Sequence, residues 1–138
     1  MITIERRAGR LVEARFTGRV SAEEIEAADL AMSRCVLETS KKVAICADYT
    51  QLTVMSDDLS EMLISMYRRH NPNIEFSAIL VAPTSGIAIL QMERVIREAK
   101  NPNRKAFRSA EALVDWLGEH LSIEERARVR GFLSQALQ

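Results

Sequence analysis

The 138-residue sequence lacks any uninterrupted apolar segment long enough to span a bilayer, so we expect no membrane insertion. It also lacks an excess of charge of either sign, because 19 basic residues balance 19 acidic ones. With no net field to attract a polyanion, we expect neither nucleic acid nor an anionic membrane surface as a partner. The opening MITIERRAGR is charged and has no apolar signal region, so we place the protein in the cytoplasm.

Cysteine and histidine are scarce, with two residues of each. Cys35 lies in a predicted helix and Cys46 in a predicted buried strand, so we expect no disulfide between them. His70 and His120 each follow a predicted helix, where an imidazolium interacts well with the helix dipole. We find no Ser–His–Asp or Cys–His arrangement and no histidine pair with metal-ligand spacing. The sequence therefore predicts no catalytic residue, no metal and no cofactor.

The most informative stretch is residues 42–69, which combines a buried strand, an acidic turn and an amphipathic helix. The predicted strand is the apolar run VAICA, which ends before the charged Asp48. Ser56 is a good N-cap, and Asp57 and Asp58 follow it in the first helical turn, where the dipole favours negative charge. One apolar helical face then contains Leu59, Met62, Leu63, Met66 and Tyr67.

Strand and helix patterns alternate along the whole chain. Residues 2–7 and 11–17 predict a hairpin around a tight turn. The full order, β-β-α-β-α-β-α-β-α-α, predicts an α/β fold with a mostly parallel five-stranded sheet whose first strand is antiparallel. We expect a single domain, with a core at residues 1–120 and an additional C-terminal helix at residues 121–138.

The stretch DYTQLTVMSDD after the central strand resembles the strand-to-helix signature of the STAS family. These are the domains of sulfate transporters and anti-sigma-factor antagonists, also called SpoIIAA-like. Asp48 and Thr50 match the beginning of the signature, and Val54 and Met55 match the apolar pair before its helix. The element order over about residues 1–120 and the closing FRSAEALVDWL also resemble the family. The resemblance implies a SpoIIAA-like fold and a non-enzymatic regulatory domain that works by protein–protein contact.

The start of the helix departs from the family pattern. Asp57 stands where the family has a phosphorylatable serine, and Asp58 and Leu59 replace the next serine and the glycine. A fixed carboxylate could mimic the phosphorylated state, although a phosphate carries more charge, about −1.5 to −2 at neutral pH. Ser56 could still be modified, with Thr50 as a second choice. The predicted partner-binding or switch residues are therefore Asp48, Thr50, Ser56, Asp57 and Asp58. An ordinary N-cap followed by two acids explains the last three equally well.

A similar loop follows the next strand and leads into another helix. An anion or a partner could bind at its helix N-terminus, although a capped helix start explains the same residue types. The pattern G-x-x-x-x-G-K-[ST] is absent, so the loop is no nucleotide-binding P-loop. The residues concerned are Thr84, Ser85 and Gly86.

The helix after this loop is apolar nearly all round its first turns. Ile87, Ile89 and Leu90 widen the expected core stripe. Such a helix is covered either by a partner, including a second copy of the chain, or by another helix of the same chain. The sequence leaves both coverings open, because the C-terminal helix could fill the second role.

These observations give three hypotheses of different classes. The first is a non-enzymatic cytoplasmic regulatory domain that binds another protein, such as a regulatory kinase or signalling protein. The alternative is a module that binds a lipid or other small apolar ligand between the sheet and the helices carrying Met62, Met66 and Met92. The third, an enzyme with Asp48 or Asp57 as general base, would require a strongly raised carboxylate pKa in a closed pocket.

Overall fold

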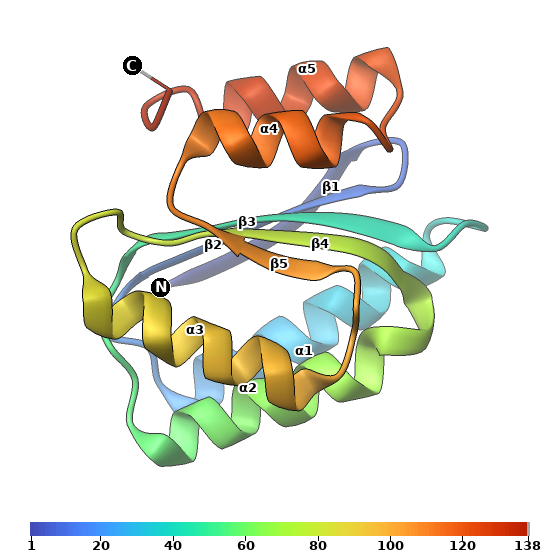
Figure 1. The fold of residues 1–138 in the computed structure, drawn as a ribbon. Helices are drawn as coiled ribbons and strands as arrows, with labels where there is room; N and C mark the ends of the chain where they lie inside the picture. The colour runs from blue at the N-terminus through green and yellow to red at the C-terminus, as the bar shows by residue number, and fades with distance from the viewer. Residues whose placement is uncertain (138) are drawn as a thin grey trace.

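The computed structural model describes residues 1–137 and contains a five-stranded sheet with the strand order β1-β2-β3-β4-β5 (Figure 1). β1 pairs antiparallel with β2, and the later neighbours pair in parallel. The predicted α/β class with a mostly parallel sheet is therefore confirmed. The strands are β1 (Ile2–Ala8), β2 (Leu11–Gly18), β3 (Val43–Leu52), β4 (Ile74–Leu80) and β5 (Arg104–Phe107).

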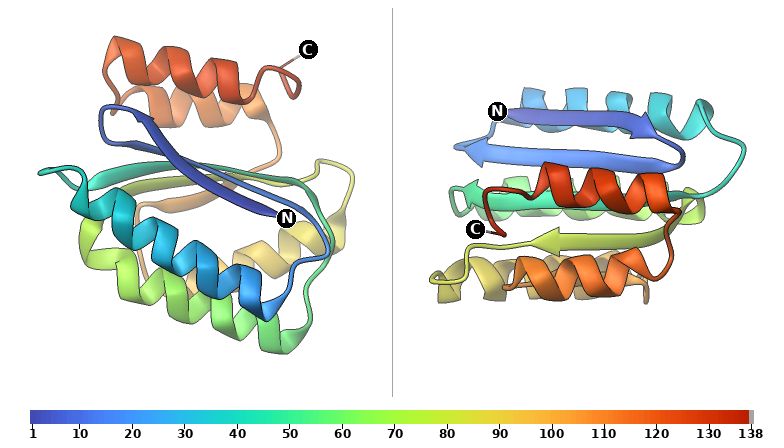
Figure 2. Two further views of the ribbon diagram at one scale, coloured as in Figure 1. Left: turned by 180° about the vertical axis from the view of Figure 1, so that it is seen from behind. Right: turned by 90° about the horizontal axis from the view of Figure 1, so that it is seen from above.

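Helices cover both faces of the sheet (Figures 1 and 2). α1, α2 and α3 pack on one face, and α4 and α5 pack on the other. Within residues 1–137, no helix has the length and apolar composition needed to cross a membrane. The helices are α1 (Ala22–Leu37), α2 (Asp57–His70), α3 (Gly86–Ala99), α4 (Ala110–Gly118) and α5 (Ile123–Phe132), and a short 3-10 turn, Asn71–Asn73, precedes β4.

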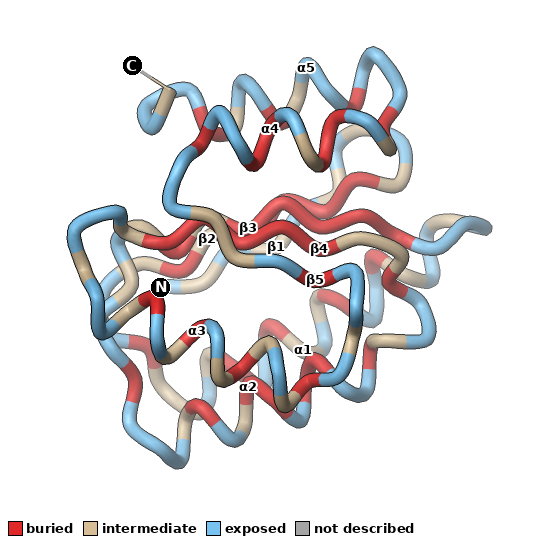
Figure 3. Tube along the Cα trace, in the orientation of Figure 1, coloured by how far each residue is buried: buried red, intermediate tan, exposed pale blue. Residues whose placement is uncertain are grey.

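Each face of the sheet has its own hydrophobic core, so the central strands are buried on both sides (Figure 3). Val12 and Phe16 of β2 pack toward α1–α3, whereas Leu11 packs toward α4 and α5. Cys35 lies in the first core and Cys46 in the second, and both are free. The prediction of no disulfide between them is confirmed, because they lie on opposite faces of the sheet.

Serine fixes the start of each of the helices α1 to α5. In every case the hydroxyl of the N-cap serine accepts a hydrogen bond from a backbone N–H of the first turn. At α1 and α5 a glutamate three residues later accepts a hydrogen bond from the backbone N–H of that serine, so both predicted capping boxes are confirmed. The N-cap residues are Ser21, Ser56, Ser85, Ser109 and Ser122.

Two element boundaries differ from the prediction. β3 continues through Asp48 to Leu52, because these polar residues keep their pairing with β2, where Arg15 lies opposite Asp48. The C-terminal helix ends at Phe132, and residues 133–137 form turns instead of a further helical turn. Gly131 near the end of α5 weakens helix propagation, which accounts for the early stop.

Candidate functional site

The predicted switch residues lie at the same end of the sheet but in two separate places. Asp48 and Thr50 lie within β3 and line a groove on the side of the sheet that α5 covers. Ser56, Asp57 and Asp58 lie at the start of α2, which packs on the opposite face of the sheet. They do not line this groove. The separation follows from the longer β3, whose alternation turns Asp48 and Thr50 toward α5.

Exposed apolar side chains gather where α2 and α3 begin. Val54 is 45% exposed, Ile87 68% and Leu90 66%. Ile89 is only 6% exposed and packs in the core, so the prediction that it faces a partner is wrong. α5 lies on the far face of the sheet and does not cover Ile87 or Leu90 (Figure 1).

The loop before α2 is fixed to α3 by one side chain. Gln91 Oε1 accepts a hydrogen bond from the N–H of Met55 at 3.1 Å, and Gln91 Nε2 donates to the carbonyl of Met55 at 2.8 Å. Val54 borders a small depression together with Ala88 and Gln91. Val54 and the first turns of α3 therefore form a continuous surface. We call this the α2–α3 surface and define it as Val54, Ser56, Asp57, Asp58, Ile87 and Leu90.

The polar residues of these two loops act as helix caps. Ser56 Oγ accepts from the N–H of Leu59 at 3.3 Å, and Asp57 and Asp58 are exposed in the first turn of α2. Ser85 Oγ accepts from the N–H of Ala88 at 3.1 Å, Gly86 begins α3, and Thr84 is exposed. The capping interpretation is confirmed at both helices, and an anion at the Thr84–Gly86 loop stays a prediction.

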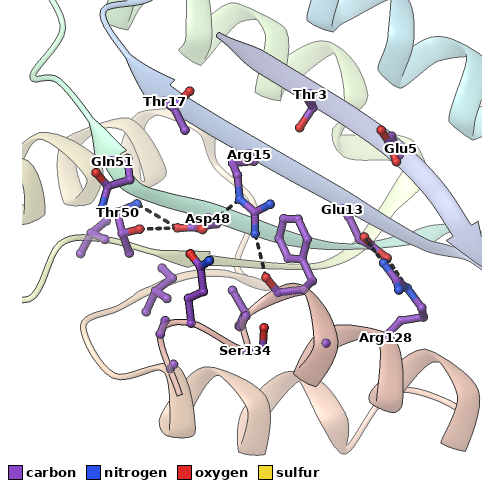
Figure 4. A pocket seen from close by; sticks show the side chains of 18 of the residues that line it. Thr3, Glu5, Glu13, Arg15, Thr17, Asp48, Thr50, Gln51, Arg128 and Ser134 are labelled. Atoms are coloured by element: carbon purple, nitrogen blue, oxygen red, sulfur yellow. Dashed lines mark hydrogen bonds and ion pairs between the residues drawn. The ribbon is translucent and has the colours of Figure 1, made fainter. Parts of the chain in front are cut away.

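The groove beside Asp48 has a volume of about 890 Å³ (Figure 4). Its floor is the polar face of β1, β2 and β3, and residues 131–136 form a wall. Arg15 Nε donates to Asp48 Oδ2 at 3.1 Å, and the other carboxylate oxygen accepts from the N–H and the hydroxyl of Thr50 at 3.0 and 2.7 Å. Arg15 Nη2 donates to the carbonyl of Phe132 at 2.7 Å. These contacts connect three separate parts of the chain.

A second ion pair in the groove was missed by the sequence analysis. Arg128 donates two hydrogen bonds to the buried carboxylate of Glu13, at 2.9 and 2.7 Å. These hydrogen bonds raise the pKa of Arg128, and so favour its charged form. In the sequence, Arg126, Arg128 and Arg130 alternate with apolar residues and are offset by two nearby glutamates, a pattern that predicts a solvated face. Glu13 lies on the polar side of the alternating residues 11–17, and that pattern alone does not show that α5 covers this side.

His70 ends α2, as predicted, but it also makes a contact that the sequence did not reveal. Its ring is buried, and Nε2 lies 2.6 Å from Asp29 Oδ1 on α1. Arg69 donates to Asp29 Oδ2 at 2.7 Å. Burial alone would raise the pKa of Asp29, but the hydrogen bonds from His70 and Arg69 outweigh it and lower the pKa overall. The cluster joins α1 to α2.

The space predicted for an apolar ligand is filled by the protein itself. Met66 and Met92 are buried in the core between the sheet and α1–α3, and Met62 packs against it. A cavity beside Met66 measures only about 20 Å³, which is room for about one water molecule. The prediction of a lipid site there is therefore wrong.

The two carboxylates considered as a general base, those of Asp48 and Asp57, lie in different surroundings. Both oxygens of Asp48 already accept hydrogen bonds, one from Arg15 and the other from Thr50. Asp57 is exposed and does not lie in a closed pocket. Among residues 1–137, no group of three or more histidine, cysteine, aspartate or glutamate side chains could hold a metal ion.

The sheet order and the helices on both faces define a SpoIIAA-like α/β fold, which confirms the resemblance seen in the sequence. The structure of this chain is similar to the crystal structure of an uncharacterized protein of the DUF3478 family from Shewanella loihica PV-4, which is described as having a SpoIIAA-like fold. The TM-score is 0.61 and the sequence identity 18%, over 85% of this chain and 92% of that chain. No family model and no curated protein matches the chain. At this identity the similarity establishes the fold alone.

Proposed function

We propose that this protein is a non-enzymatic regulatory domain of the cytoplasm that binds another protein through the α2–α3 surface. The observation that carries the proposal is the exposure of Val54, Ile87 and Leu90 beside the exposed acids Asp57 and Asp58. Single exposed apolar residues are ordinary, but a group of them with a polar rim is typical of a protein-binding site. The SpoIIAA-like fold is consistent with a regulatory role.

The surface favours a partner of particular chemistry. Ile87 and Leu90 need an apolar pocket or ridge on the partner, and Asp57 and Asp58 need basic groups beside it. A regulatory kinase or another signalling protein with such a surface fits the proposal. A second copy of the chain would fit only if it presented basic residues to the two aspartates.

Ser56 is the position that we propose as a switch. Its hydroxyl is exposed at the start of α2, beside Asp57 and Asp58. A phosphate there would add about −1.5 to −2 charges to the acidic rim and would strengthen binding to a basic partner. Thr50 suits this role less well, because its hydroxyl donates to Asp48 in the groove.

Two matched double variants test the proposal. Ile87→Ser with Leu90→Ser changes the α2–α3 surface, and Leu30→Ser with Leu37→Ser changes α1 at residues that are 64% and 84% exposed. Both double variants remove two exposed apolar side chains, so their effects on solubility and on nonspecific binding should be similar.

The readout is quantitative cross-linking and capture from cells that express the protein, followed by binding of the purified partner. We expect the Ile87 and Leu90 pair to lose the partner, the Leu30 and Leu37 pair to retain it, and Ser56→Glu to increase recovery. Equal recovery by the two double variants would contradict the proposed surface. Thermal unfolding of each variant shows that a loss of binding is not a loss of fold.

A further inference from the structure

We propose that the groove between β1–β3 and residues 131–136 binds a small organic anion through a carboxylate or phosphate group. This site is separate from the α2–α3 surface, since none of the residues that define that surface lines the groove. Its volume of about 890 Å³ lies within the usual range of small-molecule sites, about 300–1,000 Å³.

The charge of the lining favours an anion. Four arginines and three carboxylates line the groove, although the chain as a whole has no net charge. Each carboxylate pairs with an arginine: Glu5 with Arg7, Glu13 with Arg128 and Asp48 with Arg15. The remaining cation is Arg108, which is exposed and forms no ion pair within residues 1–137.

Arg15 supplies a second donor that is already held in position. Its Nε and Nη2 bind Asp48 and the Phe132 carbonyl, and its guanidinium lies 4.2 Å from the centre of the Phe132 ring. Its Nη1 makes no hydrogen bond to the described part of the chain, and the side chain is 40% exposed. A guanidinium fixed by three contacts loses little entropy when it binds a ligand oxygen.

The groove also has an apolar part, so the ligand is more than an inorganic ion. Leu80, Val81 and Leu133 border it but are almost fully buried, so the apolar side chains that stay accessible are those of Pro83, Phe132 and Ala136. An anion with a small apolar body would place its charged group near the arginines and its body against these side chains. Carboxylate and phosphate both offer the oxygen geometry that arginine binds well.

Three probes of similar size separate charge from apolar contact. Phenyl phosphate and benzoate have the same ring with different anionic groups, and benzyl alcohol is neutral. Amide chemical shifts are followed by NMR at constant ionic strength, with Thr50, Gln51 and Ser134 as reporters of the groove. We expect both anions to shift these amides, the dianionic phenyl phosphate to bind more tightly, and benzyl alcohol to leave them unchanged.

A pair of arginine variants tests the location. Arg108→Gln should weaken phenyl phosphate binding about tenfold, because a hydrogen bond to a charged group is lost. Arg97→Gln removes the same charge from an exposed position on α3, on the opposite face, and should leave the affinity unchanged. Equal weakening by both variants, binding of benzyl alcohol as tight as that of the anions, or no shift at millimolar probe would each overturn the proposal.

Discussion

At the residue scale, one half-buried carboxylate, that of Asp29, connects α1 and α2. Asp29 accepts from Arg69 and lies within hydrogen-bond distance of His70. Neither residue type nor helical spacing reveals this contact, because Asp29 and His70 are 41 positions apart in the chain. Sequence analysis treats them as separate polar residues, and only the packing of the two helices brings them together.

We predict that Asp29→Asn destabilises the protein by about 1–2 kcal/mol at neutral pH, because it removes charge-assisted hydrogen bonds. The folded pKa of Asp29 lies below its ordinary value of 3.8, so its stabilisation is present above that pH and is lost as the pH falls below it. Urea unfolding between neutral and acidic pH should therefore show a difference from wild type that shrinks at low pH.

Asp115→Asn is the matched control for this measurement. Asp115 is exposed on α4 and forms no ion pair within residues 1–137, so its substitution should change stability little at any pH. A difference between wild type and Asp29→Asn that stays constant down to low pH would show that Asp29 contributes through packing instead of charge.

The burial of some individual residues could be predicted from the sequence. Ile89, Met92 and Val95 of α3 are buried and lie at spacings of three residues, which fits one helical face. Ile87 and Leu90 lie off that face and are exposed. A run of apolar residues without interruption hides this difference, so the sequence grouped Ile89 with its exposed neighbours.

At the scale of elements, α5 illustrates a helix held by polar contacts as well as by apolar packing. Arg128 binds Glu13 of β2, and Glu125 accepts a hydrogen bond from the N–H of Arg10 in the turn before β2 at 2.8 Å. The start of α5 was predictable from its capping box, which is a local signal. Its docking on β2 was not, because that depends on partners more than 100 positions away.

We predict that Arg128→Ala loosens α5, because Glu13 is left buried without its partner. Opening of α5 should become easier by about 1–2 kcal/mol, so its amides should exchange with deuterium about tenfold faster. Amides of α1, α2 and α3 should keep their wild-type rates.

Arg130→Ala provides the comparison, since Arg130 is exposed on the same helix and forms no ion pair with the described residues. If both variants accelerate exchange of α5 equally, the effect comes from helix propensity or net charge and the Glu13–Arg128 pair does not hold the helix.

At the scale of the whole molecule, the sheet separates two surfaces. The α2–α3 surface lies with α1–α3, and the groove lies on the side of α4 and α5. Alternating strands and helices made the fold class predictable. The side that a polar residue faces is set by strand alternation only as far as the strand continues. Because β3 continues past Asp48 to Leu52, Asp48 and Thr50 are separated from residues 56–58, with which the sequence analysis had grouped them.

The central claim is that a protein partner contacts the α2–α3 surface. Hydrogen exchange of the purified complex, compared with the free protein, tests this most directly because it requires no substitution. We predict slower exchange at residues 54–58 and 86–91, with α1 and α5 unchanged. Protection over α1 or around the groove, with none at these two segments, would contradict the account.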